Sequence, residues 1–211
     1  MKTYKITNGL YLVIDPSMEL RLMLQKVEAA LKGGVAIIQI WNHFLENTDG
    51  SLIVRSVVNL AHQFGVPVLI NEDISFINMV DGVHFDEIPA DFDTLKASFP
   101  SDKIIGITCG NDFTKIEWAV ANKLDYISFC SVFPSKSVST CDLVSRDIIN
   151  KARAYTSMPI FLSGGIDLNN LPLLEDTGLD GIAVISGIMS AENPEEMASN
   201  YNQALINLNK K

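Results

Sequence analysis

The feature that most constrains the fold of this chain is a regular alternation of short apolar runs with longer amphipathic stretches. We expect strands at residues 10–14, 36–40, 68–70, 82–85, 104–108, 126–129, 159–162 and 181–185. We expect helices at residues 18–32, 51–64, 74–79, 89–99, 112–122, 145–155, 168–176 and 194–208, because apolar residues recur there at helical spacing. Strands that are apolar throughout are typical of a parallel sheet covered by helices.

About eight strand–helix units in strict alternation favour an α/β fold, and specifically a single (β/α)8 TIM barrel. An open, doubly wound sheet is the alternative. It would usually have fewer strands and a glycine-rich turn after the first strand, but that turn here reads Asp15-Pro16-Ser17. The chain has no linker, low-complexity segment or strong internal repeat, so we expect residues 1–211 to form one barrel domain.

Composition argues against several classes of partner. The formal net charge is −9, which argues against nucleic acid because binding its phosphates requires lysine and arginine. No apolar run approaches the roughly 18 residues of a membrane span, so we expect no membrane contact.

The cysteines Cys109, Cys130 and Cys141 form no CxxC pair, and sparse thiols favour a cytoplasmic location. The sequence does not fix the oligomeric state, and a homodimer is one assembly that it allows.

The active site of such a barrel lies where the strands end and the following loops begin. Gly164 and Gly165 follow the seventh strand, and Ile185 and Ser186 stand at the end of the eighth. Loops at these two places commonly hold a phosphate through backbone N–H groups, and glycine allows the close approach that this needs. We therefore predict a phosphorylated small molecule as ligand. The alternative is that these residues only form tight turns.

Polar side chains at other strand ends are candidates for binding the rest of that molecule. Gln39 interrupts the apolar run of the second strand, and Asn71, His84 and Thr108 stand at the ends of the third, fourth and fifth. An amide or a hydroxyl there can hydrogen-bond a ligand ring. A purely structural role, with each group satisfied by neighbouring protein atoms, is the alternative.

Two further sets of residues suit a second phosphorylated group. Glu72 and Asp86 follow neighbouring strands, and such carboxylates can share a Mg²⁺ that in turn holds a diphosphate. The loop after the sixth strand contains Ser135, Lys136 and Ser137, whose hydroxyls and ammonium group suit phosphoryl oxygens. The alternatives are a solvated acidic rim and a flexible serine-rich loop without a ligand.

Several motifs occur together in the order and spacing of one family. They are Leu10–Val13, Gly33–Val35 with Ile38-Gln39, Leu69–Asn71, Asp81–His84, Ile104–Gly106, Asp125–Ile127, Val132–Pro134, Gly164–Ile166 and Gly181–Ser186. As a set they resemble thiamine phosphate synthase and its relative, thiazole tautomerase. The resemblance extends roughly from Leu10 to Met189.

This resemblance implies a (β/α)8 barrel enzyme that joins 4-amino-5-hydroxymethyl-2-methylpyrimidine diphosphate to a thiazole phosphate. Pyrophosphate leaves first, and the thiazole nitrogen captures the resulting pyrimidine methyl cation. That step needs Mg²⁺ and cationic side chains to stabilise the leaving diphosphate. By resemblance, Glu72 and Asp86 hold the metal, and Ser135, Lys136 and Ser137 form the catalytic loop.

The diphosphate half of the site departs from the family pattern. Where the family has Gln-x-Arg-x-Lys, this chain has Gln39, Trp41 and His43, so both cations are absent. The family's Thr-x-Thr-Lys loop reads Ser135-Lys136-Ser137-Val138 here, which moves the lysine by two places. We expect Lys136 to replace a lost cation from this shifted position.

Three hypotheses follow from these departures. The first is a thiamine phosphate synthase, a transferase that releases pyrophosphate, with an altered diphosphate site. The second is a tautomerase-like isomerase that uses His43 or His84 as acid and base, since Ser131 stands where that relative has its histidine. The third is a protein that binds thiazole phosphate or thiamine phosphate with little catalysis.

Overall fold

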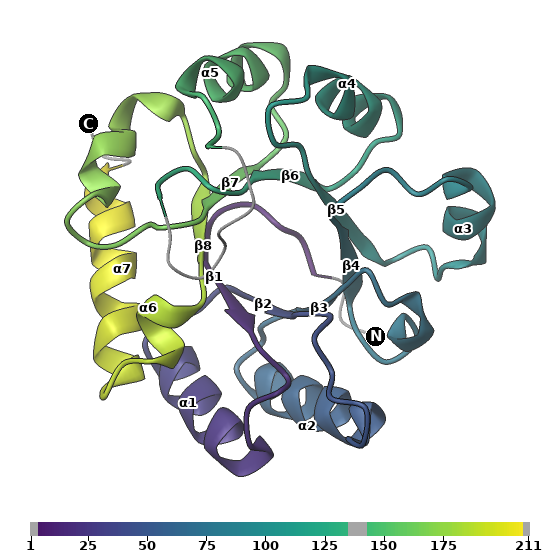
Figure 1. Cartoon of the computed structure of the whole chain (residues 1–211), viewed down its shortest axis with the longest axis vertical. Coiled ribbons are helices and arrows are strands. Elements are labelled where there is room, and N and C mark those ends of the chain that lie inside the picture. Colours follow the sequence, from purple (N-terminus) through teal and green to yellow (C-terminus); the bar gives the residue numbers. More distant parts are fainter. Residues whose placement is uncertain (1–3, 135–142, 209–211) are drawn as a thin grey trace.

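Eight parallel strands close into a barrel. The computed structural model describes residues 4–134 and 143–208. The strands pair in sequence order, and β8 pairs with β1 to complete the ring, with helices around the outside (Figure 1). The predicted (β/α)8 barrel is therefore confirmed.

The predicted strands match the observed ones to within one residue at each end. The strands are β1 (Gly9–Ile14), β2 (Ile37–Ile40), β3 (Val68–Asn71), β4 (Gly82–Phe85), β5 (Ile104–Thr108), β6 (Tyr126–Phe129), β7 (Ile160–Ser163) and β8 (Gly181–Val184). The α-helices are α1 (Leu20–Lys32), α2 (Gly50–Gln63), α3 (Phe92–Ser98), α4 (Phe113–Ala121), α5 (Arg146–Tyr155), α6 (Ser186–Met189) and α7 (Pro194–Leu208). Two 3₁₀ helices are η1 (Ile74–Phe76) and η2 (Leu171–Thr177).

The helices differ from the prediction at four places, and one of them is α3, which begins at Phe92 and not at Pro89. Residues 168–176 were expected to be α-helical but form the 3₁₀ helix η2, whose second residue, Pro172, has no N–H for an α-helical bond. The segment 74–79 shortens to η1, whose start Asp73 caps by accepting from the Ser75 N–H and hydroxyl at 3.1 and 2.6 Å. The helix α6 was not predicted, since four residues are too few to show apolar periodicity.

Aromatic rings fill the N-terminal half of the barrel interior. Tyr11, Tyr126 and Phe161 point inward, and their ring centroids lie 6.0, 5.6 and 5.5 Å apart in edge-to-face contacts. Such contacts are favoured by the aromatic quadrupole. Ile6, from the segment before β1, packs against the same cluster and helps to fill that half of the interior.

Glycines make the space that these rings occupy. A Cβ atom at Gly106 would lie 2.2 Å from the Tyr126 ring, and one at Gly181 would lie 2.5 Å from the Phe161 ring. Both distances are far below van der Waals contact. The strands β5 and β8 therefore need glycine where the rings cross the interior.

The ring of helices closes where α7 packs beside α1 (Figure 1). The side-chain amide of Asn202 in α7 donates to the carbonyl groups of Gly33 and Gly34, both at 2.8 Å. These bonds satisfy carbonyls at the C-terminal end of α1. In the part of the chain that the structure describes, no helix is both long and apolar enough to cross a membrane.

The substitution Gly106→Ala tests this packing. We expect it to lower the free energy of unfolding by about 1–3 kcal/mol, the usual cost of overpacking a core, as measured by urea denaturation. In a Tyr126→Ala background the added methyl group has room, so the same substitution should cost much less there. Additive losses in the two variants would contradict the proposed contact.

Candidate functional site

Polar side chains form the upper layer of the barrel interior, at the C-terminal ends of the strands. Gln39, Asn71, His84 and Ser128 are buried, and Thr108 is partly buried. Each belongs to a different strand, so the barrel brings together four residues that the sequence analysis singled out. Ser128 was not predicted, although a hydroxyl within the apolar run of β6 could have indicated a polar position inside the barrel.

Two tyrosines connect the aromatic layer to this polar layer. The Tyr11 hydroxyl donates to Gln39 Oε1 at 2.6 Å. The hydroxyls of Tyr11 and Tyr126 lie 2.9 Å apart. Burial raises the pKa of both phenols, so both stay protonated at neutral pH. Neither tyrosine was predicted, because an aromatic residue in an apolar strand also reads as core.

His84 continues the same series of hydrogen bonds. Its Nδ1 lies 2.8 Å from the Tyr126 hydroxyl, and its Nε2 lies 2.9 Å from the Thr108 hydroxyl. Thr108 in turn lies 3.1 Å from the Ser128 hydroxyl. Burial lowers the pKa of His84 to about 4, so the ring is neutral at pH 7.

The two histidines of the isomerase hypothesis differ in their surroundings. Both ring nitrogens of His84 contact buried or partly buried hydroxyls. The side chain of His43 is 60% exposed, and its Nδ1 lies 3.3 Å from Asp15 Oδ2. Its ring lies 5.0 Å from that of Trp41, centroid to centroid. His43 and Trp41 therefore occupy the loop after β2, where the family pattern has cations.

The structure places the two residues predicted to bind metal in direct contact. The Asp86 N–H donates to Glu72 Oε1. The side-chain amide of Asn71 donates to Asp86 Oδ2 at 3.2 Å and to the His84 carbonyl at 3.3 Å. Glu72 has a positive φ of 59°, an unusual conformation for a residue other than glycine. The β3 and β4 loops are thus joined through these side chains.

This pair fits the donor set that Mg²⁺ uses when it binds a phosphorylated substrate. Mg²⁺ commonly takes one or two carboxylates and completes its shell with substrate phosphates and water. Within the described residues, Glu72 Oε2 and Asp86 Oδ1 make no hydrogen bond. No cluster of three or more potential metal-binding side chains occurs in the same part of the chain. Glu72 and Asp86 would therefore hold the ion together with the substrate.

Lys115 is a cation next to this pair that the sequence analysis missed. It lies in the first turn of α4, and its Nζ is 3.1 Å from the Asp86 carbonyl and 2.6 Å from Glu87 Oε2. The side chain of Lys115 is only 13% exposed. A lysine in the first turn of a helix is unfavourable because it opposes the helix macrodipole. Its position in the sequence could therefore have indicated a specific role. The N–H, carbonyl and carboxylate groups of Asp86 are each bonded by a different side chain.

The two turns predicted to bind phosphate lie side by side, because Ser163 pairs with Ala183 just before them. Gly164 and Gly165 have φ values of 87° and 67°, which other residues rarely adopt. A Cβ atom on Gly165 would lie 2.6 Å from the Pro134 carbonyl oxygen. This turn is thus packed against the loop after β6.

Backbone donors are available in both turns. Among the described residues, no hydrogen bond is donated by the N–H groups of Gly165, Ser186 or Gly187. Gly187 has a second role, since a Cβ atom there would lie 2.6 Å from the Tyr201 hydroxyl. Tyr201 is buried and donates to the Ile166 carbonyl at 3.3 Å. Tyr201 of α7 therefore contacts both turns.

The predicted catalytic residues Ser135, Lys136 and Ser137 lie outside the described residues. The chain before them ends its described part at Pro134. After them, the Leu143 carbonyl accepts from the Asn111 side chain at 3.0 Å. The Ser145 N–H donates to Asn111 Oδ1 at 2.9 Å, so Asn111 fixes the return of this loop to the barrel.

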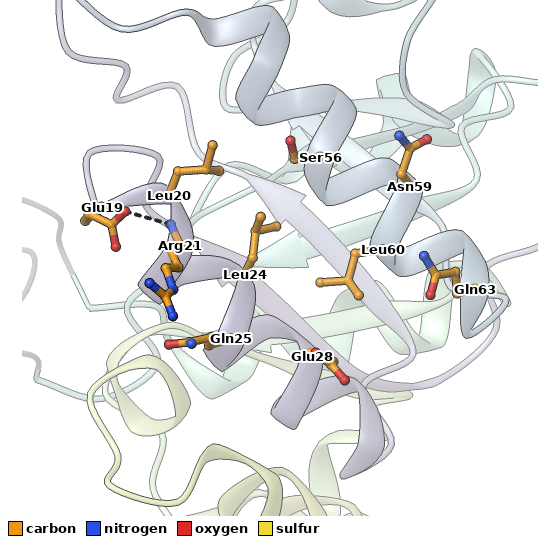
Figure 2. Close-up of a pocket in the computed structure, with 10 residues that line it drawn as sticks. All are labelled: Glu19, Leu20, Arg21, Leu24, Gln25, Glu28, Ser56, Asn59, Leu60 and Gln63. Atoms are coloured by element: carbon orange, nitrogen blue, oxygen red, sulfur yellow. Dashed lines mark hydrogen bonds between the residues drawn. The ribbon is translucent and has the colours of Figure 1, made fainter.

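A groove on the outer surface is separate from these residues. It lies between α1 and α2 and has a volume of about 520 Å³, with Leu24 and Leu60 between polar residues such as Gln25 and Asn59 (Figure 2). Apart from Glu19, the N-cap residue of α1, its lining residues belong to α1 and α2, and none of them is a predicted site residue. The groove is therefore not part of the candidate site.

The fold places the chain among TIM-barrel proteins of known structure. Thiamine phosphate pyrophosphorylase from Pyrococcus furiosus superposes with a TM-score of 0.79 and 22% identity, covering 95% of this chain and 96% of that one. Orotidine 5'-monophosphate decarboxylase from Methanocaldococcus jannaschii superposes with a TM-score of 0.68 and 18% identity, covering 95% and 99%.

Sequence comparison gives the family. The family model described as thiamine monophosphate synthase matches residues 10–188. Thiamine-phosphate synthase of Azoarcus sp. (strain BH72) is 31% identical over 195 residues, 92% of this chain and 95% of that protein. The synthase of Methanobrevibacter smithii is 30% identical over 194 residues, 91% and 92% of the two chains. The chain belongs to the thiamine monophosphate synthase family, as its motifs indicated.

The role of Lys115 in fixing the Asp86 loop is testable by Lys115→Met, which keeps the length of the side chain. We expect the free energy of unfolding to fall by about 1.5–3 kcal/mol, the value of a charged hydrogen bond, and hydrogen exchange around Asp86 to quicken. Glu87→Gln is the matched control, because the Glu87 side chain is 80% exposed and its ion pair adds little. Unchanged exchange in Lys115→Met would contradict the role.

Proposed function

We propose that this protein is a thiamine-phosphate synthase that couples hydroxymethylpyrimidine diphosphate to thiazole phosphate and releases pyrophosphate. The observation that carries the proposal is the meeting of two small-residue turns, a polar layer and a carboxylate pair at one end of the barrel. Family membership and the names of the relatives support the same reaction. The reaction is that of a cytoplasmic biosynthetic enzyme, and Cys109 and Cys130 are free thiols, as that compartment favours.

The two turns suit the monophosphate of the thiazole substrate. Gly165, Ser186 and Gly187 offer N–H groups without a partner in the described chain. Backbone N–H groups bind phosphate oxygens well, because they are fixed in place before the ligand arrives. We assign the thiazole phosphate to this side of the site, with Gly164 and Ile185 completing the two turns.

The carboxylate pair suits the diphosphate of the pyrimidine substrate. Glu72 and Asp86 would hold Mg²⁺, which supplies positive charge to the departing pyrophosphate. Lys115 orders this region by holding the Asp86 carbonyl. We assign Ser135, Lys136 and Ser137 to the same half of the site, where Lys136 supplies the cation absent at positions 41 and 43.

The polar layer suits a reaction that passes through a carbocation. Gln39, Asn71, His84 and Thr108 are assigned to the pocket of the substrate rings, which they line without carrying charge, although both nitrogens of His84 are already bonded within the protein. The hydroxyls of Tyr11 and Tyr126 are protonated, and burial raises the pKa of the Cys109 thiol to about 12. None of these groups is a strong nucleophile at neutral pH. The cation is therefore left for the thiazole nitrogen to capture.

The coupling reaction itself is the first test. We expect the purified protein to form thiamine phosphate from both substrates in the presence of Mg²⁺, measured by fluorescence after oxidation of the product. No product above an empty-vector control would reject the proposal. Calorimetric binding of thiazole phosphate without turnover would instead support the binding-protein hypothesis.

The phosphate assignment is testable with Ser186→Asp. A carboxylate beside a bound phosphate costs on the order of 1–4 kcal/mol, so KM for thiazole phosphate should rise at least about tenfold. Ser190→Asp is the matched control, since Ser190 is an exposed serine at the other end of α6. Equal KM values in the two variants would contradict the assignment. Gly187 is a poor test, because any side chain there would also displace Tyr201.

The metal assignment is testable with Glu72→Gln. The variant should need about tenfold more Mg²⁺ or greater for half-maximal rate, and its calorimetric binding of Mg²⁺ with pyrophosphate should weaken in parallel. Asp73→Asn is the control, because that carboxylate bonds only to Ser75 within the described chain. An unchanged Mg²⁺ requirement in Glu72→Gln would contradict the assignment.

A further inference from the structure

Six side chains form one continuous series of hydrogen bonds through the barrel interior. In order they are Gln39, Tyr11, Tyr126, His84, Thr108 and Ser128. Each hydroxyl has a single proton, so it can donate to only one of its two neighbours. The direction of one bond therefore decides the direction of the next.

The bond between Tyr11 and Gln39 sets the direction. Its length of 2.6 Å is typical of O–H···O bonds and short for N–H···O bonds, so the Gln39 oxygen is the acceptor. The Tyr11 proton is used in this bond. Tyr126 must then donate to the Tyr11 oxygen across their 2.9 Å contact.

The direction passes from the tyrosines to the histidine. Because the Tyr126 proton points to Tyr11, the Tyr126 oxygen can only accept from His84 Nδ1, at 2.8 Å. Nδ1 therefore carries a proton. The other ring nitrogen, Nε2, lies 2.9 Å from the Thr108 hydroxyl, which lies 3.1 Å from the Ser128 hydroxyl and ends the series there. The stacked rings of His84 and Tyr126, 5.5 Å apart, hold this geometry.

We infer that Tyr126 and His84 are positioning residues that fix the Gln39 amide with its oxygen bound inside the barrel and its NH₂ group free for a ligand. Within the described residues, Gln39 Nε2 makes no hydrogen bond. The site then selects a ring whose edge at Gln39 is a hydrogen-bond acceptor. A ring with a donor there would require Gln39 to turn over and every bond in the series to reverse.

This inference goes beyond the proposed function, because it concerns the bond directions in the free protein. Nuclear magnetic resonance tests them through the His84 tautomer, which these directions determine. In protein labelled with ¹⁵N-histidine, two-bond ¹⁵N–¹H correlations distinguish the Nδ1–H form of the ring from the Nε2–H form. The chain has three histidines, so His43→Gln and His62→Gln identify the His84 signals by elimination. We expect Nδ1–H. An Nε2–H ring with bare Nδ1 would overturn the inference, whether or not the protein is a synthase.

Two variants test the connection to Gln39. Tyr126→Phe removes the acceptor for Nδ1–H, so His84 should change to the Nε2–H form. KM should rise about tenfold for the substrate whose ring contacts Gln39, because one neutral hydrogen bond is worth at most about that much. The value of kcat should change less. Thr108→Val should weaken substrate binding in the same way, and Thr108→Ser should restore it.

Phe161→Leu is the matched control for packing. It removes the edge contacts to Tyr11 and Tyr126 but no hydrogen bond. We expect a lower melting temperature with His84 still in the Nδ1–H form. If Phe161→Leu changed the ring form as Tyr126→Phe does, the effect would come from packing alone, and the inference would be wrong.

Discussion

The constraint on which the rest of this structure depends is the need to fill a closed eight-stranded barrel. The strands surround a space that must be packed with side chains. Here three aromatic rings and four aliphatic side chains pack together in its N-terminal half, and glycines at positions 106 and 181 make room for two of the rings. Two of the rings are tyrosines, and their hydroxyls require partners once they are buried. Those partners are the polar residues of the candidate site, so packing and recognition share the same side chains.

Much of the fold could be predicted from the sequence because each strand is short, apolar and separated by amphipathic stretches. The strand ends then followed from the TIM-barrel rule, which placed Gln39, Asn71, His84 and Thr108 in one layer. The helices were harder, because a segment of six to nine residues has too few turns for apolar spacing to distinguish an α-helix from a 3₁₀ helix. In addition, Pro172 lacks the N–H that an α-helix beginning at residue 168 would need.

The parts of the candidate site that could not be predicted are those that depend on contacts distant in sequence. Tyr126 is an ordinary strand residue until the barrel places it between Tyr11 and His84. Lys115 is far from Asp86 along the chain, and only the meeting of the β4 and β5 loops makes it a partner. The pairing of Glu72 with Asp86 was within reach of prediction, since neighbouring parallel strands end at the same edge.

Tyr201 connects the last helix, α7, to the rim of the barrel. Its hydroxyl lies next to Gly187 and donates to the Ile166 carbonyl, so one side chain of α7 supports both turns of the barrel rim. A displacement of α7 would therefore widen the rim and separate its two turns. In an ancestral or redesigned chain, α7 could therefore not be replaced by an unrelated outer helix without disturbing the candidate site.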